Sequence, residues 1–141
     1  MKSKWIRGFI FFLLVLLFPA CQSSTSTKLK TTTVVLDGKI ERLTESGRPC
    51  FAGYIKNVGN SLGMWCSVSM ELFSDANKSV SIGTAGADAD WLPNRGTLSP
   101  GERVYFKAMS VCDNCTQNDI KSYKGKIEWT NEDYSKGSTE F

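Results

Sequence analysis

The sequence predicts an all-β domain folded as an antiparallel sandwich, and three observations support this fold class. Apolar and polar side chains alternate with a period of two in several segments, as in strands with one face on a core and the other in water. Turn-forming residues separate these segments at short intervals. Outside the N-terminal apolar run, no stretch of ten or more residues shows helical periodicity. About six short strands with regular turns are typical of an antiparallel sandwich.

Residues 1–20 are predicted to form an export signal. Lys2, Lys4 and Arg7 precede an unbroken apolar run from Phe9 to Phe18. This run is too short to cross a bilayer, because a spanning helix needs about 20 residues. A charged start, a short apolar centre and a small residue before the cut site are typical of a secretory signal.

The signal ends in Ala20 followed directly by Cys21, which resembles the lipobox of bacterial lipoproteins. In that family the cysteine thiol receives a diacylglyceryl group and becomes the new N-terminus. The resemblance therefore implies lipidation of Cys21 and attachment to a membrane through the lipid. Gln22, which is not Asp, resembles the sorting pattern of outer-membrane lipoproteins, so the expected location is the cell envelope, at the outer rather than the inner membrane.

Residues 21–33 are predicted to be a flexible, lipid-bearing tether. Eight of the twelve residues from Gln22 to Thr33 are Ser or Thr, and such a segment has little to bury. A coil of this length spans ~20 Å on average. A glycosylated stalk has the same composition and stays open as an alternative.

Removal of the signal leaves 121 of 141 residues, which is enough for one domain, expected over 34–141. The full chain is formally +3, but the three basic residues of the signal account for this, and 14 basic and 14 acidic residues remain. This balance gives no basic patch for nucleic acid. The chain has no His, which excludes Ser–His and Cys–His nucleophile pairs and imidazole metal ligands. Serine–lysine or carboxylate chemistry stays open, since it depends on a spatial arrangement that the sequence does not show. A protein that is not an enzyme and has no cofactor is expected.

The strands of the domain follow from local patterns. The alternation is weaker in the segments Thr33–Ile40, Phe51–Val58 and Ser79–Thr84, and clearest in Met64–Leu72, Val104–Met109 and Tyr123–Trp129. Turn residues lie between them, at Asp37-Gly38, Val58-Gly59-Asn60, Asp75-Ala76-Asn77 and Ser99-Pro100-Gly101-Glu102. In the last of these turns, Pro and Gly stand at the two central positions that a type II turn requires.

Three motifs within 51–108 carry a resemblance to a known family. Residues 53–59 read Gly-Tyr-Ile-Lys-Asn-Val-Gly, residues 70–75 read Met-Glu-Leu-Phe-Ser-Asp, and Leu-Ser-Pro-Gly-Glu at 98–102 is followed by Phe106. They are similar to the Gly-x-Val-x-Asn-x-Gly start, the Phe-x-Leu-Tyr-Asp strand end and the turn of the FxLYD group. The resemblance implies an immunoglobulin-like or fibronectin-III-like sandwich. That family has no common active site, so no catalytic residue is implied.

Four cysteines remain beside Cys21, and an even number in an exported chain predicts disulfides. The strands that begin at Phe51 and Arg103 are expected to be antiparallel neighbours in one sheet. We therefore predict a disulfide from Cys50 to Cys112 or Cys115. Cys66 is expected to be buried as a small apolar residue. Two other interpretations of the C-x-x-C pair stay open, a redox dithiol and half of a zinc site.

Aromatic residues outside the predicted core are candidate contacts for a partner or glycan. Trp91, in a loop, is the first candidate, and Trp65 and Tyr105 on outward strand faces are the others. Cross-strand packing is the structural alternative for such residues. Asp88 and Asp90 stand in a glycine-containing loop, but no closing Glu at EF-hand spacing follows them, so a solvated loop is favoured over a calcium site.

These features predict a lipid-anchored, non-catalytic envelope lipoprotein that acts as an interaction or assembly module, with an envelope protein as partner. Two alternatives stay open. One is a domain that binds a glycan, a small molecule or Ca²⁺, and the other is a thiol-redox or metal protein that uses Cys112 and Cys115. No metal site is assigned, and no nucleic-acid partner is expected.

Overall fold

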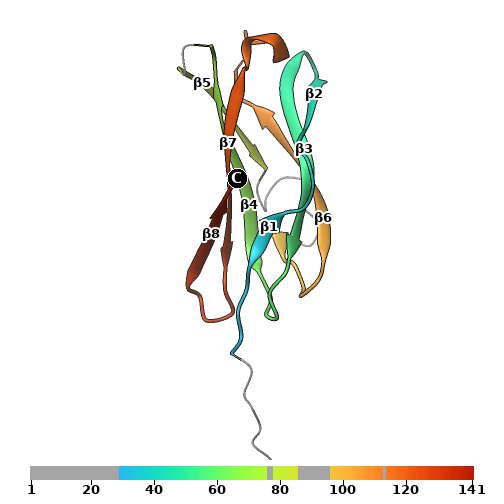
Figure 1. Ribbon diagram of the computed structural model, residues 1–141, viewed down its shortest axis with the longest axis vertical. Helices are drawn as coiled ribbons and strands as arrows, with labels where there is room; N and C mark the ends of the chain where they lie inside the picture. The colour runs from blue at the N-terminus through green and yellow to red at the C-terminus, as the bar shows by residue number, and fades with distance from the viewer. Residues whose placement is uncertain (1–28, 76–77, 86–95, 113) are drawn as a thin grey trace, which may run out of the picture.

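The computed structural model describes residues 29–75, 78–85, 96–112 and 114–141, and it shows an antiparallel, immunoglobulin-like β-sandwich (Figure 1). The predicted fold class is thus confirmed. The 3-10 helix η2 (Gln117–Asp119) precedes the seventh strand. The strands are β1 (Val34–Leu36), β2 (Glu41–Glu45), β3 (Arg48–Asn57), β4 (Met64–Phe73), β5 (Ser79–Ala85), β6 (Arg103–Ser110), β7 (Ser122–Thr130) and β8 (Lys136–Glu140).

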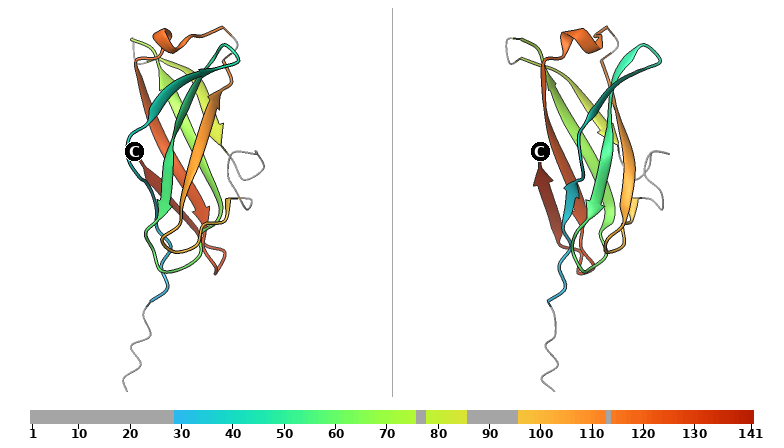
Figure 2. Two further views of the ribbon diagram at one scale, coloured as in Figure 1. Left: turned by 90° about the vertical axis from the view of Figure 1, so that its right-hand side faces the viewer. Right: turned by 45° about the vertical axis from the view of Figure 1, so that its right-hand side comes forward.

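The strands form two layers of one folded sheet, in the order β1-β3-β6-β5-β4-β7-β8, with β2 also paired to β3. One layer holds β1, β2, β3 and β6, and the other holds β5, β4, β7 and β8 (Figure 2). The layers are joined on one side by a short seam, where Gly83 and Thr84 of β5 pair with Ser110 and Met109 of β6. On the opposite side, β1 lies beside β7 and β8.

The register of the strands places their alternating apolar residues between the layers. In the first layer Phe51 pairs with Ala108 and Ile55 with Val104, and in the second Val68 pairs with Ile127. Burying one such side chain stabilises the fold by ~1.5–3 kcal/mol. The buried core consists of Val34, Phe51, Ile55, Cys66, Val68, Met70, Leu72, Leu98, Val104, Phe106, Ala108, Ile120, Ile127 and Trp129.

The predicted strands are found, with one shortened and two more added. The strand expected over Thr33–Ile40 is reduced to β1, because the backbone turns at Gly38, where φ is 109°. The strands β2 and β8 were not predicted, since their mostly polar sequences lack an alternating apolar face. The predicted turn at 99–102 is formed: the Glu102 N–H donates to the Ser99 carbonyl over 3.0 Å, and Gly101 has φ of 80°.

Residues 29–33, which the sequence assigns to a flexible tether, are hydrogen-bonded to the domain. The N–H groups of Asn60 and Val58 donate to the carbonyls of Thr31 and Thr33, each over 2.8 Å. The Asn60 Nδ2 group also donates to the Leu29 carbonyl over 3.0 Å. Residues 21–28 of the predicted tether lie outside the described residues, whereas residues 29–33 are held against the domain. Composition could not reveal this, because these contacts use backbone groups and not apolar side chains.

Within the part of the chain that the structure describes, no helix has the length and apolar character to cross a bilayer.

Candidate functional site

The outward face of β3 and β6 carries a pair of tyrosines. Tyr54 lies directly opposite Tyr105 in the antiparallel register, while their chain neighbours Ile55 and Phe106 face the core. The two rings meet edge to face with 5.2 Å between centroids, an arrangement that aromatic pairs prefer. Tyr105 is 38% exposed, so part of its ring remains available to a partner.

Arg103 extends this pair into an ordered stack. Its guanidinium carbon lies 3.4 Å from the centroid of the Tyr54 ring, and its Nε donates to the Asp37 carboxylate over 2.6 Å. Asp37 follows β1, and its N–H donates to the Tyr54 carbonyl over 2.8 Å, so the carboxylate is itself held in position. An exposed cation–π contact contributes ~0.5–1 kcal/mol. We call these residues, Asp37, Tyr54, Arg103 and Tyr105, the Tyr54–Tyr105 face.

Charged groups border the Tyr54–Tyr105 face on the side of β2. The Lys107 ammonium donates to the Glu45 carboxylate over 2.5 Å, and this hydrogen bond raises the pKa of Lys107. Partial burial, followed by the Glu41 carboxylate, raises the pKa of Tyr105 above its ordinary value. The phenol therefore stays protonated at neutral pH and its O–H can donate a hydrogen bond to a partner.

The Tyr54–Tyr105 face is suited to binding. Tyr and Arg are enriched among the residues that dominate protein–protein affinity. Because Arg103 and Tyr54 are already fixed by Asp37, little side-chain freedom is lost when a partner binds them. The surface has aromatic area at its centre and charge at its border.

Trp65 lies on the other layer, as the second residue of β4. It stands at a bulge in the pairing of β4 with β7, and its φ of 49° is rare for a bulky residue. Tyr134, in the turn between β7 and β8, also has a positive φ, of 65°. Both rings are exposed, and together with Ser67, Glu128, Trp129, Thr130 and Lys136 they line a shallow hollow.

The structure therefore does not bring the predicted contact residues together. Tyr105 and Trp65 belong to opposite layers of the sandwich. Cys21, Trp91 and the acidic loop with Asp88 and Asp90 lie outside the described residues.

Sequence reasoning did not single out Asp37, Tyr54, Arg103 or Tyr134 as contact residues of these surfaces. Arg103 stands two positions before Tyr105 in one strand, so the period-two pattern could have placed both on one face. Asp37 joins them only through the pairing of β1 with β3. Tyr134 lies in a turn, where alternation gives no signal.

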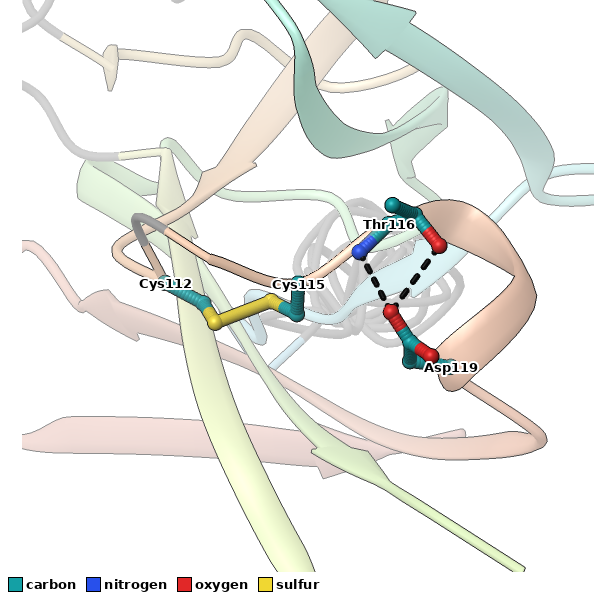
Figure 3. The surroundings of a disulfide bond; sticks show 4 residues. All are labelled: Cys112, Cys115, Thr116 and Asp119. Carbon is teal, nitrogen blue, oxygen red and sulfur yellow. Dashed lines mark hydrogen bonds between the residues drawn. A yellow bond between two sulfur atoms is a disulfide. The ribbon is translucent and has the colours of Figure 1, made fainter.

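The predicted disulfide from Cys50 is not formed. Cys112 and Cys115 are bonded to each other (Figure 3), and Cys50 is a buried free thiol. The strand pairing behind that prediction is correct, because β3 and β6 are antiparallel neighbours. However, Cys50 lies within the sheet, where it pairs with Met109 on one side and Leu43 on the other. Cys112 and Cys115 are close to each other in the same loop, with their Cα atoms 5.7 Å apart.

The loop that carries the disulfide is fixed to the sheet by polar contacts. The N–H and the hydroxyl of Thr116 donate to the Asp119 carboxylate over 2.7 and 2.9 Å (Figure 3), and they lower the pKa of Asp119. The Gln117 amide donates to the carbonyls of Leu43 and Cys50 over 2.5 and 3.1 Å. The loop therefore covers the strand end at which Cys50 lies.

The free thiols of Cys50 and Cys66 have low reactivity at neutral pH. Burial raises the pKa of Cys66 to about 12, and burial followed by the Glu45 carboxylate raises the pKa of Cys50. Both groups are thus neutral at physiological pH, and a neutral thiol is neither a good nucleophile nor a metal ligand. Among the described residues, no three His, Cys, Asp or Glu side chains gather as a potential metal site.

These features define the class of the protein, an immunoglobulin-like β-sandwich with exposed aromatic surfaces. No protein family and no curated protein sequence matches the chain. Among solved structures, it is similar to the archaellum periplasmic stator protein complex FlaF and FlaG from Sulfolobus acidocaldarius. That alignment has 14% identity and a TM-score of 0.37, and it covers 82% of this chain and 94% of the other. The structural genomics target SoR45 aligns with 10% identity and a TM-score of 0.38, over 78% of this chain and 83% of the other.

Proposed function

We propose that this protein is a lipid-anchored, non-catalytic envelope lipoprotein whose sandwich binds another envelope protein through the Tyr54–Tyr105 face. The observation that carries the binding proposal is the ordered stack of Asp37, Arg103, Tyr54 and Tyr105 on an exposed sheet face. The FxLYD resemblance agrees with a binding module, because that family has no common catalytic site.

The anchor is supported by the lipobox-like end of the signal, with Cys21 as the lipidated residue. Acyl chains bind a bilayer with ~0.8 kcal/mol per buried methylene, and more than one chain is needed for durable attachment. Gln22 favours the outer membrane as the destination. The segment that leads into β1 lies at one end of the sandwich (Figure 1), so the proposed anchor joins the domain at that end.

The shape of the Tyr54–Tyr105 face favours a protein over a small ligand. Small molecules are usually bound in concave, mostly apolar pockets, whereas this face belongs to a sheet with a charged border. Aromatic and Arg side chains at the centre with polar groups at the rim are typical of protein–protein interfaces. The glycan, small-molecule, Ca²⁺ and thiol-redox alternatives stay predictions.

Site-specific photo-crosslinking in cells tests the proposed interface. A photoreactive residue replaces Lys56, which lies opposite Arg103 in the register, and in a control it replaces Ser69 on the outward face of the other layer. We expect a discrete protein adduct from position 56 and none from position 69. Tyr105→Ala should abolish the adduct, since loss of a dominant contact costs at least ~2 kcal/mol, or about 30-fold in affinity. Equal adducts from both positions, or an adduct that survives Tyr105→Ala, would contradict the proposal.

Intact mass spectrometry of membrane-extracted protein tests the anchor separately. We expect a polypeptide that begins at Cys21 and carries acyl mass. A mature chain without acyl mass, or one that retains its leader, would contradict the anchor and leave the interface result standing.

A further inference from the structure

Exposed apolar side chains gather at the end of the sandwich where the chain enters. Leu29 is 79% exposed and Tyr134 is 75% exposed, and Val58 and Trp65 are each more than half exposed. Val58 lies in the turn between β3 and β4, and Tyr134 lies in the turn between β7 and β8. Both turns are at the end that residues 29–33 approach (Figure 1). We call Leu29, Val58, Trp65 and Tyr134 the entry-end patch.

Glu132 connects the entering segment, residues 29–33, to this end of the sandwich. Its carboxylate accepts from the Lys30 ammonium over 2.7 Å and from the Leu62 N–H over 3.4 Å, so it joins the entering segment to the turn between β3 and β4. Thr32 adds a hydrogen bond from its hydroxyl to the Leu62 carbonyl over 2.9 Å. These contacts hold the entering segment, and with it Leu29, against the turns that carry Val58 and Tyr134.

The covalent distance from this point to Cys21 is short. The residues between Cys21 and Leu29 reach at most about 30 Å even when fully extended. If Cys21 is acylated, as proposed above, Leu29 can never lie farther than this from the acylated cysteine. The segment between Cys21 and Leu29 therefore keeps this end of the molecule close to the lipid surface.

We infer that the entry-end patch rests on the lipid surface and sets the orientation of the sandwich. Trp and Tyr rings favour the boundary between lipid and water, because each combines an apolar body with a polar group. Trp65 and Tyr134 both have positive φ angles, and both rings are more than half exposed. Leu29 and Val58 contribute purely apolar surface beside them. This inference rests on the proposed lipid anchor.

The orientation has a consequence for the other surfaces. The long axis of the sandwich then stands away from the membrane, with the Tyr54–Tyr105 face turned sideways. The tip of the β2–β3 hairpin and the helix η2 lie at the opposite end (Figure 2). A partner anchored in the same membrane could then reach the Tyr54–Tyr105 face.

Lipid-quenching measurements on the full acylated protein in vesicles of phosphatidylethanolamine and phosphatidylglycerol test this orientation. Tyr134→Cys provides an attachment site for an environment-sensitive dye, and Ser46→Cys, at the tip of the β2–β3 hairpin, is the matched control. Dye should attach selectively, because Cys50 and Cys66 are buried and Cys112 and Cys115 are bonded. We expect nitroxide-labelled lipid to quench the dye at position 134 several-fold more than the dye at position 46.

Equal quenching at both positions in acylated protein would overturn the orientation and leave the anchor intact. A mature protein that carries no acyl mass would overturn the anchor and the orientation together. The dye at position 134 could change its emission in native membranes but not in vesicles that contain no other protein. That result would assign the entry-end patch to a protein partner and overturn the lipid assignment.

Discussion

At the scale of single residues, Asn57 shows how one buried polar side chain can organise a turn. It is the last residue of β3 and is fully buried. Its Nδ2 donates to the carbonyls of Ser61 and Leu98 over 2.8 and 3.0 Å, and its Oδ1 accepts from the Gly59 N–H over 3.0 Å. The amide thus satisfies backbone groups that the sheet leaves unpaired, which explains why this position carries Asn rather than an apolar residue.

Asn57→Ala should therefore be strongly destabilising. Each buried group left without a partner costs ~1–3 kcal/mol, so we expect a loss of at least about 2 kcal/mol in the free energy of unfolding. Urea denaturation measures this loss. Asn60→Ala, in the same turn, is the control, because the hydrogen bonds of Asn60 are exposed and water can replace them. Equal losses for the two variants would contradict the structural role of Asn57.

Because of the Cys66 thiol, we expect the free energy of unfolding to fall at alkaline pH. Its pKa is raised from 9.0 to about 12 in the folded protein, because burial disfavours the thiolate. The folded state therefore holds this proton more tightly than the unfolded state. The contribution of the thiol to the free energy of unfolding is complete below pH 9 and declines as the pH rises toward about 12. In urea titrations over this range, Cys66→Ala should show a shallower decline than the wild type. Parallel slopes would rule out the thiol as the cause.

At the scale of elements, the edge strand β8 depends on close packing against β7. Gly137 lies opposite Trp129, and a side chain at that glycine would collide with the indole ring. Gly125 faces the Phe141 ring in the same way. Gly137 thus leaves room for the Trp129 ring of β7, and Gly125 leaves room for Phe141, which directly follows β8.

The disulfide of the loop before β7 should contribute little to stability. Cys112 and Cys115 are separated by three positions, and closing so short a loop stabilises by at most ~2 kcal/mol. We expect mild reduction to leave the protein folded and to expose two thiols to an alkylating reagent, as counted by mass spectrometry. Cys112→Ser combined with Cys115→Ser is the control. Alkylation of a thiol in the unreduced, native protein would contradict the assignment of Cys50 and Cys66 as buried.

At the scale of the whole molecule, the two layers are held together mainly by their shared core. The seam between β5 and β6 has only two pairs of residues, whereas buried side chains from both layers interlock along the sandwich. Ile55 belongs to one layer and Ile127 to the other, and both are fully buried. Neither layer can bury its apolar face alone, so the domain should unfold as one unit.

Ile55→Val and Ile127→Val test this cooperativity as a matched pair. Each removes one buried methylene and should lower the free energy of unfolding by ~0.5–1.5 kcal/mol. Tryptophan fluorescence and circular dichroism should report a single transition in the wild type, and each substitution should move both signals together. A substitution that shifts one signal and leaves the other unchanged would show that the layers unfold separately.

The sequence by itself determined the all-β class, the main core strands and the burial of Cys66. These follow from period-two alternation and turn residues, which are local properties. Only the tertiary structure decided the edge strands, the attachment of residues 29–33, the local pairing of Cys112 with Cys115, and the separation of Tyr105 from Trp65. Those features depend on which distant backbone groups and side chains meet across the sheet. Alternation shows which side of a strand faces the core, but it does not show which strand lies beside it.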